Sequence, residues 1–140
     1  MEGHFLEHEE IGPPLTQLSV EQARYLGIQL RADEEEFDFS MVAISEMLRT
    51  EQTARALGAK ATRVYPILNE VLLTDEEKQM LLRNKIPLSV FERGAEILDD
   101  PPEEQVVVSH GGPIAGLCAV LGVQVERFLP VHLETRILDF

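Results

Sequence analysis

Residues 106–113 read VVVSHGGP, and this stretch largely decides which fold the sequence predicts. Three consecutive β-branched valines (106–108) are typical of a buried strand. The glycines at 111 and 112 indicate a tight turn, and Pro113 suits the first turn of the helix expected over the apolar run 114–122. His110 is therefore expected at the point where a strand ends and a helix begins.

A residue at such a junction can take part in anion binding. The N-terminus of a helix carries unpaired N–H groups and the positive end of the helix dipole, so it favours negative charge. In open α/β sheets, ligands also gather beyond the carboxyl ends of the strands. His110 is thus either a histidine that faces a phosphate or one that only caps or packs at the turn, and this stretch alone leaves both interpretations open.

The composition limits the class of protein. The chain has 140 residues, of which 44% are hydrophobic, and we expect one globular domain over residues 1–140. It carries 12 basic and 25 acidic residues, a net charge of −13, which argues against general binding to nucleic acid or to an anionic membrane. An anionic ligand would therefore need a local cluster of positive groups.

The only cysteine and the hydropathy pattern predict a cytoplasmic protein. Cys118 cannot form a disulfide within the chain, and its place on the apolar stripe of the helix after Pro113 assigns it to the core. A reducing compartment fits such a cysteine. No apolar run approaches the roughly 20 residues of a membrane span, and the acidic N-terminus lacks the positive region of a signal peptide.

Helix starts and strand-like runs alternate along the chain, which predicts an α/β sandwich. Capping-box patterns begin at Ser19, Thr74 and Ser89, and the first opens a helix over about residues 20–31. Another helix is expected over about residues 46–57, ending at Gly58. Strand-like runs cover residues 39–44, 63–68, 105–108 and 133–140, and HFLE (4–7) is a candidate for one more. Pro66 places the second run at an edge or makes it end early.

Arg49 is the candidate cation for an anionic ligand. The stretch SEMLRTEQTARALG (45–58) places it at the front of a helix, directly after the strand-like run FSMVAI. The planar guanidinium presents a fixed fork of donors that suits phosphate oxygens. The alternative interpretation is an ordinary exposed arginine.

Three segments together resemble a known family. GPPLTQLSVEQARYLG (12–27), SEMLRTEQTARALG (45–58) and VVVSHGGPIAGLCAVLG (106–122) are similar in order and spacing to segments of the histidine phosphatase superfamily, the phosphoglycerate-mutase-like proteins. The resemblance runs from about residue 12 to the end of the chain. It implies a three-layer α/β/α sandwich with a mostly parallel sheet, and an active site of two histidines, two arginines and an acidic residue that needs no cofactor.

The resemblance also implies roles for individual residues. His110 is similar to the second histidine, which stabilises charge on the transferring phosphoryl group, and Gly111 lies beside it in the phosphate-binding segment. Arg49 is similar to the second arginine. Glu70, in PILNEV, is similar in position to the proton donor, although PxLxE is a short match and an ordinary loop carboxylate is the alternative. These roles agree with phosphoryl transfer, which depends on positioning and charge stabilisation.

The Arg-His-Gly run that marks this family is absent from the sequence. In one register His8 is the phosphate-accepting histidine, and Glu7 replaces the usual arginine; such a like-charge contact with phosphate costs about 4 kcal/mol at 4 Å and an effective dielectric constant of about 20. In another register MEGHF follows a missing Arg-His pair. The chain would then lack the nucleophile and would need a partner to cover an exposed sheet edge.

HFLEH (4–8) also matches a His-x-x-Glu-His zinc motif, which requires a helix and a third ligand. Gly3 disfavours a helix there and no third ligand is evident, so we expect no metal. The leading hypothesis is a phosphatase of reduced activity that acts on a phosphomonoester through a phosphohistidine intermediate; the short chain leaves little room for the lid of a mutase. The alternative is a non-catalytic phosphate-binding or interaction module. The expected partners are a small phosphorylated substrate or phosphate ion and, in a homodimer, a second copy of the chain.

Overall fold

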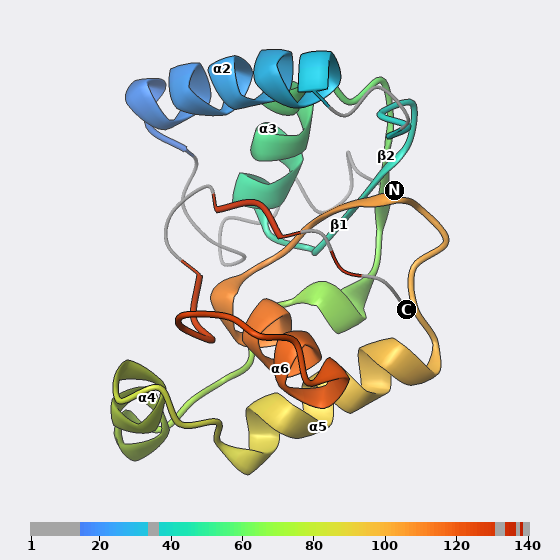
Figure 1. The fold of residues 1–140 in the computed structure, drawn as a ribbon. Helices are drawn as coiled ribbons and strands as arrows, with labels where there is room; N and C mark the ends of the chain where they lie inside the picture. Colours follow the sequence, from blue (N-terminus) through green and yellow to red (C-terminus); the bar gives the residue numbers. More distant parts are fainter. Residues whose placement is uncertain (1–14, 34–36, 131–133, 137, 139–140) are drawn as a thin grey trace. The chain divides into compact units, whose positions relative to one another are not determined.

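The computed structural model describes residues 15–33, 37–130, 134–136 and 138. It divides the chain into two compact units (Figure 1). Unit 1 consists of Met1–Pro66 and Pro102–Val108, and unit 2 of Ile67–Pro101 and Ser109–Phe140. The strand predicted at HFLE and the candidate nucleophile His8 lie outside the described residues, and the expectation of a single domain stays a prediction.

The described residues of unit 1 form a parallel sheet of three short strands in the order β2-β1-β3. These are β1 (Val42–Ile44), β2 (Thr62–Val64) and β3 (Val106–Val108). Ile44 at the end of β1 pairs with Val64 and with Val108, so the three carboxyl ends lie at the same edge. The predicted α/β class with a parallel sheet is confirmed.

The triple-valine strand is less buried than its sequence predicts. Val107 is 41% exposed, whereas all three residues of the central strand β1 are fully buried. Among the described strands β3 pairs with β1 alone, so one of its sides lacks the cover that a central strand has. Pro66 behaves as predicted: β2 ends at Val64, and the proline begins the 3-10 turn η2 (Pro66–Leu68).

Helices α2 (Gln17–Asp33) and α3 (Leu48–Leu57) pack against each other in unit 1 (Figure 1). The capping box predicted at Ser19 is wrong, because the helix begins two residues earlier and Thr16 Oγ1 accepts the hydrogen bond of the Ser19 N–H at 3.1 Å. Gly27 of α2 lies so close to the backbone of Leu57 that a side chain would not fit. The absence of a Cβ therefore sets how closely the two helices approach.

The end of α3 is the one predicted. Gly58 has a φ of 112°, in the left-handed region that glycine adopts most easily, and its N–H is bonded to the carbonyls of Ala54 and Arg55. The apolar core of unit 1 joins this helix to the sheet. Its buried members are Phe39, Val42, Ile44, Ala54, Leu57 and Ala59.

Unit 2 is helical, with α4 (Asp75–Leu82), α5 (Leu88–Asp99) and α6 (Gly111–Leu121). The capping box at Thr74 is confirmed in both directions, with hydrogen bonds of 3.1 Å and 2.9 Å to Glu77. The one predicted at Ser89 is wrong: α5 starts at Leu88 after Pro87, and the Ser89 hydroxyl instead donates to Glu77 Oε2 at 2.6 Å. A polar side chain can thus resemble a cap in sequence and bond to another helix in space.

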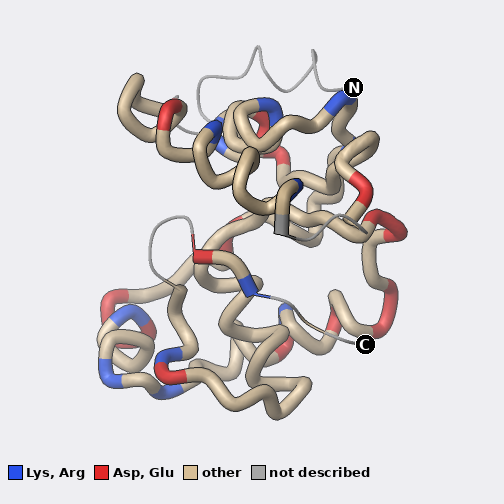
Figure 2. The backbone as a smooth tube through the Cα atoms, turned by 45° about the horizontal axis from the view of Figure 1, so that its top comes forward, with Lys and Arg blue, Asp and Glu red and all other residues tan. Residues whose placement is uncertain are grey.

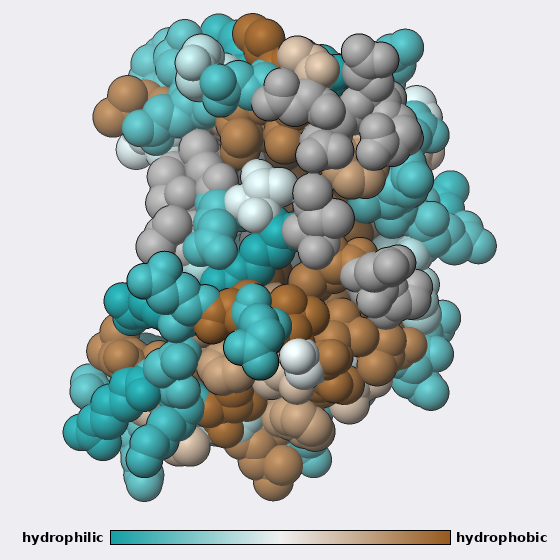
Figure 3. All heavy atoms as spheres, in the orientation of Figure 1, coloured by the Kyte–Doolittle hydropathy of each residue, from teal (hydrophilic) through white to brown (hydrophobic). Residues whose placement is uncertain are grey.

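Helices α5 and α6 are held together by glycine contact and by apolar burial. A Cβ on Gly94 would overlap the backbone of Gly116, so the helix backbones touch here. Cys118 is fully buried, as predicted for a core residue. The buried core comprises Val71, Leu81, Val90 and Ala115, and the larger of these side chains each contribute about 1.5–3 kcal/mol when fully buried. The face of unit 2 in Figure 3 is apolar over α6.

The remaining predictions concern the C-terminus, the charge and the membrane. Of the strand predicted over residues 133–140, the described residues 134–136 and 138 form no strand. Acidic residues recur along both units, and in the described part the lysines and arginines do not gather into one stripe (Figure 2). None of the described helices combines the length and the apolar character that crossing a bilayer requires.

Candidate functional site

The first turn of α6 is capped by a carboxylate from a distant part of the sequence. Glu70 Oε1 accepts hydrogen bonds from the Gly112 N–H at 2.9 Å and from the Val71 N–H at 3.0 Å. His110 is the N-cap residue by its extended backbone, but its side chain does not bond to the helix terminus. His110 therefore does not cap the helix through its side chain, since Glu70 provides the cap, and the alternative that it packs at the turn stays open.

The two glycines after His110 serve a purpose other than the predicted tight turn. Both belong to α6, and among the described glycines only Gly58 and Gly122 have positive φ. A Cβ on Gly112 would overlap the Glu70 carboxylate, and a Cβ on Gly111 would lie 2.6 Å from Leu129 Cδ1. The glycine pair thus lets two side chains approach the helix end, one charged and one apolar.

The segment that carries Glu70 is fixed by two side chains. Arg93 of α5 donates Nη1 to the carbonyl of Ile67 at 3.3 Å and to that of Asn69. Ser109, just before α6, donates its hydroxyl to the Leu68 carbonyl at 2.8 Å. Neither contact is predicted by the sequence. An arginine and a serine that bond to backbone carbonyls leave no spacing signal, because the carbonyl can belong to any residue.

Arg49 occupies the first turn of α3 in unit 1, where the preceding loop is well defined. The buried Ser45 accepts the Met47 N–H at 3.1 Å through Oγ, and Thr50 Oγ1 donates to the Met47 carbonyl at 2.8 Å. These bonds fix the path from β1 into the helix and the place of the half-buried Arg49.

The structure brings together some of the predicted site residues. Within unit 2, Glu70 is bonded to the turn of helix that His110 and Gly111 begin. Arg49 belongs to unit 1, so its convergence with His110 stays a prediction. That prediction rests on the shared edge at which the strands before them, β1 and β3, end. His8 lies outside the described residues.

This arrangement has the elements of an anion site with an acid beside it. The first-turn N–H groups of α6 favour negative charge, and Glu70 now supplies that charge itself. A bound phosphate oxygen would compete with the carboxylate for the Gly112 N–H. Among the described residues no group of three or more histidine, cysteine, aspartate and glutamate side chains is arranged to hold a metal ion.

A groove in unit 1 is separate from these residues. It lies between α2 and α3, and it contains the buried Glu51, whose Oε1 is 3.4 Å from the Nε of Arg55. This pair is spaced i, i+4 along α3, which is a common stabilising arrangement on a helix. None of the predicted site residues lines the groove.

The fold has counterparts among solved structures. The crystal structure of TTHB049 from Thermus thermophilus matches with a TM-score of 0.57 and 26% sequence identity, over 84% of this chain and 74% of that chain. A mutant of the same protein matches with a TM-score of 0.56 and 27% identity, over 83% and 73%. No protein-family model matches the chain, and no curated protein does either.

Proposed function

We propose that this chain is a phosphatase-type member of the histidine phosphatase superfamily that hydrolyses a small phosphomonoester through a phosphohistidine intermediate, with weak activity, in the cytoplasm. One observation carries the proposal: Glu70, the candidate proton donor, is bonded to the first turn of α6, which begins directly after His110. Residues 70 and 112 are far apart in sequence, so their contact depends on the fold. The fold thus places an acid next to the residue that follows His110 and Gly111.

The proposed reaction has two steps. In the first, an imidazole nitrogen of the nucleophilic histidine, assigned to His8, forms a bond to phosphorus while the ester P–O bond breaks. Glu70 takes up a proton from solvent when it is released from the first-turn N–H groups, and it gives this proton to the leaving oxygen. In the second, a water molecule forms a bond to phosphorus, the P–N bond breaks and phosphate is released, with Glu70 as the base that accepts the proton of the water.

The other residues stabilise charge in this scheme. His110 and the first-turn N–H groups of α6 face the transferring phosphoryl group, and Arg49 binds its non-bridging oxygens. Binding of phosphate displaces Glu70 from the Gly112 N–H. The released carboxyl group then stands beside the phosphoryl group, where a proton donor is needed.

A second candidate is a phosphate-binding module without catalysis. The absence of an Arg-His-Gly run favours it, because the cation next to the nucleophile is replaced by Glu7 in the register that retains a histidine. Such a module keeps the anion site but forms no phosphohistidine. The two candidates therefore differ in covalent chemistry and agree in phosphate binding.

The decisive experiment compares leaving groups. Nitrophenolate leaves readily without a proton, whereas an alkoxide needs one, so a proton donor matters most for alkyl phosphates. In the Glu7→Arg background, in which turnover should be higher, we expect Glu70→Gln to slow hydrolysis of an alkyl phosphate by about 100-fold or more, and that of p-nitrophenyl phosphate far less. Glu92→Gln, an exposed carboxylate on α5, is the matched control. Equal losses on both substrates would refute the role of Glu70 as acid.

Phosphate binding tests both candidates, and turnover with an acid-labile phosphoprotein separates them. The wild type should be stabilised thermally by phosphate and vanadate, and His110→Ala should lose this effect. Binding without any turnover or acid-labile phosphoprotein would support the module, and stability that is indifferent to both anions would remove both candidates.

A further inference from the structure

Leu129 lies directly against the first residue of α6. A Cβ on Gly111 would be 2.6 Å from Leu129 Cδ1 and 3.9 Å from Pro130 Cδ. Phe128 and Leu129 also pack against the apolar core of unit 2. We call residues 127–130 the strap. The strap therefore contacts the first turn of α6 at Gly111, and the next residue of that turn, Gly112, is bonded to Glu70.

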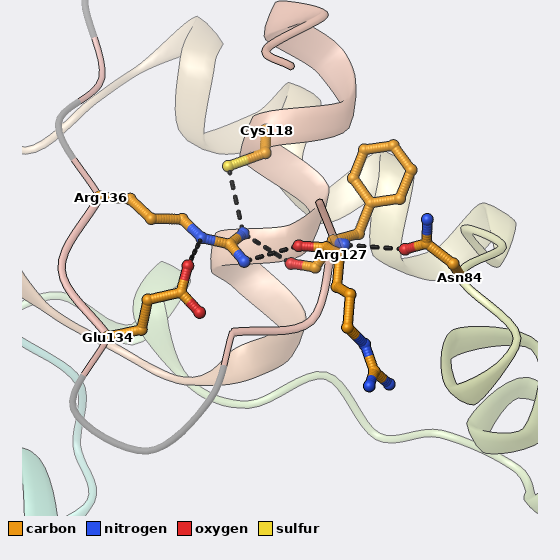
Figure 4. A network of polar contacts seen from close by, with 6 residues as sticks. Asn84, Cys118, Arg127, Glu134 and Arg136 are labelled. Atoms are coloured by element: carbon orange, nitrogen blue, oxygen red, sulfur yellow. Dashed lines mark hydrogen bonds and ion pairs between the residues drawn. The ribbon is translucent and has the colours of Figure 1, made fainter. Parts of the chain in front are cut away.

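The strap is held by a buried guanidinium (Figure 4). Arg136 donates Nη1 to the Phe128 carbonyl at 2.6 Å and Nη2 to the Arg127 carbonyl at 2.7 Å. Its Nε is paired with Glu134 at 2.7 Å, and its side chain is only 9% exposed. A buried cation is costly unless its donors are satisfied, so the strap carbonyls and Arg136 depend on each other.

The other side of the strap is held by Asn84. Its Oδ1 accepts the Phe128 N–H at 2.8 Å, and Asn84 itself adopts a φ of 60°, which asparagine tolerates better than most residues. The N–H and the carbonyl of Phe128 are thus both bonded to side chains. Because neither belongs to a helix or sheet, side chains determine where the strap lies.

We propose that Arg136 is a latch that keeps the strap closed, so that Leu129 covers the first turn of α6, and that release of the latch uncovers this turn. Arg136 is a positioning residue, since it acts on the helix end through Leu129. The consequence for ligands rests on the proposed function. A closed strap limits water at the first-turn N–H groups, and their attraction for an anion is stronger where water is excluded.

Amide hydrogen exchange of the full chain tests the latch without any ligand. Arg136→Gln should raise the exchange rates of Phe128, Leu129 and the first-turn amides of α6 by about tenfold or more, because it frees two strap carbonyls. Arg127→Gln is the matched control: it removes the same charge from the strap, but its exposed guanidinium points away from the latch in Figure 4. Unchanged exchange in Arg136→Gln would overturn the proposal.

A second set of variants tests the contact itself and does not depend on Arg136→Gln folding. Gly111→Ala would place its methyl group 2.6 Å from Leu129 Cδ1, so the Leu129 side chain must turn away from the helix end and strap exchange should rise. Adding Leu129→Ala in the same chain should restore slow exchange at the amide of Phe128, since the methyl group then fits. First-turn amides of α6 whose exchange is unaffected by Leu129→Ala alone would show that Leu129 does not cover the helix end.

Phosphate distinguishes this inference from the function on which it rests. In the wild type and in Arg127→Gln, we expect phosphate to raise the melting temperature, and we expect a smaller rise in Arg136→Gln. If phosphate has no effect on the wild type while the exchange results hold, the latch stands and the proposed function fails. If phosphate stabilises the wild type and Arg136→Gln equally, the latch has no part in anion binding and this inference fails.

Discussion

Glu70 Oε1 lies 2.9 Å from the backbone nitrogen of Gly112, so a carboxylate 42 positions earlier in the chain caps α6. The same oxygen accepts the Val71 N–H, which fixes the carboxylate relative to its own backbone. A negative charge at this end of a helix is stabilising because it faces the positive end of the dipole. The contact is therefore both a structural cap and the feature on which the proposed chemistry depends.

Removal of this cap should destabilise unit 2. We expect Glu70→Ala to lower the free energy of unfolding by about 1 kcal/mol, and Glu70→Gln to lower it less because an acceptor oxygen remains. Urea denaturation gives both values. Glu92→Ala removes an exposed carboxylate of α5 and should be close to neutral. If Glu70→Ala proved as stable as the wild type, the hydrogen bond to Gly112 would contribute nothing to the stability of unit 2.

Glu77 should make the free energy of unfolding depend on pH in the acidic range. Its pKa is lowered first by the hydrogen bond from Ser89 and then by the backbone N–H of Thr74. A carboxyl group whose folded pKa is below its unfolded value of about 4.3 contributes stability that is present above that pH and is lost as the pH falls through the folded pKa. The stability advantage of the wild type over Glu77→Gln should therefore shrink on acidification below about pH 4.3.

Urea denaturation of the two proteins between neutral pH and about pH 3 measures this advantage. Glu76→Gln is the control, because Glu76 shares the first turn of α4 but has neither the Ser89 nor the Thr74 contact. If the wild type exceeded Glu77→Gln in stability by the same amount at both ends of this pH range, the pKa of Glu77 would not be lowered in the folded state.

The contact between α5 and α6 should be intolerant of a single methyl group. Gly94→Ala would place a Cβ in the backbone of Gly116, and the only relief is separation of two helices, so we expect a loss of about 1–3 kcal/mol. Gly122→Asn is the control, since nothing lies within 4 Å of that site and asparagine tolerates its φ of 68°. A stable Gly94→Ala would mean that the helices are farther apart than described.

The sequence predicted correctly those helix ends whose interactions involve residues close together in the chain. Gly58 ended α3 because a left-handed residue was needed there, and Thr74 with Glu77 formed the capping box because both partners lie within one turn. The failures at Ser19 and Ser89 have one cause. Each serine matched the pattern but lies inside its helix and not at the N-cap. The Ser19 N–H is bonded to Thr16, and the Ser89 hydroxyl is bonded to Glu77, while Pro87 is the N-cap of α5.

The candidate site was predictable only in part, because its contacts join residues distant in sequence. The run before His110 predicted a strand followed by a helix, and both exist. The sequence could not show that Gly111 and Gly112 make room for Leu129 and Glu70, because close approach and a tight turn use the same residue type. The role of Arg136 could not be predicted either. It binds the backbone carbonyls of residues 127 and 128, and every residue type has such a carbonyl.

Arg49 should be the cation that binds the anionic ligand. A ligand that binds only the folded state stabilises it by about 2.7 kcal/mol at about 100 times its Kd. We expect phosphate, sulfate or vanadate to raise the melting temperature of the wild type, and this rise to be smaller in Arg49→Ala. Lys60→Ala, which removes an exposed cation just after α3, controls for loss of positive charge. Equal shifts in wild type and Arg49→Ala would place the anion elsewhere.

The last prediction concerns Glu7 and His8 and follows from the sequence alone, since both residues lie outside the described part of the chain. A nucleophilic histidine must be neutral to attack phosphorus. Glu7, Glu9 and Glu10 favour the charged imidazolium and also repel the incoming phosphate, so both effects oppose catalysis. We therefore expect hydrolysis of p-nitrophenyl phosphate by the wild type to be low or undetectable near pH 7.

Glu7→Arg should raise this activity, because it replaces a repulsive charge worth about 4 kcal/mol, at 4 Å and an effective dielectric constant of about 20, by an attractive one. Glu9→Gln controls for a simple reduction of negative charge, and it should raise activity less because it supplies no donor fork for phosphate. In the Glu7→Arg background, His8→Ala should abolish turnover and the acid-labile phosphoprotein together. Turnover that survives His8→Ala would show that another residue accepts the phosphoryl group, and the assignment of His8 would then be wrong.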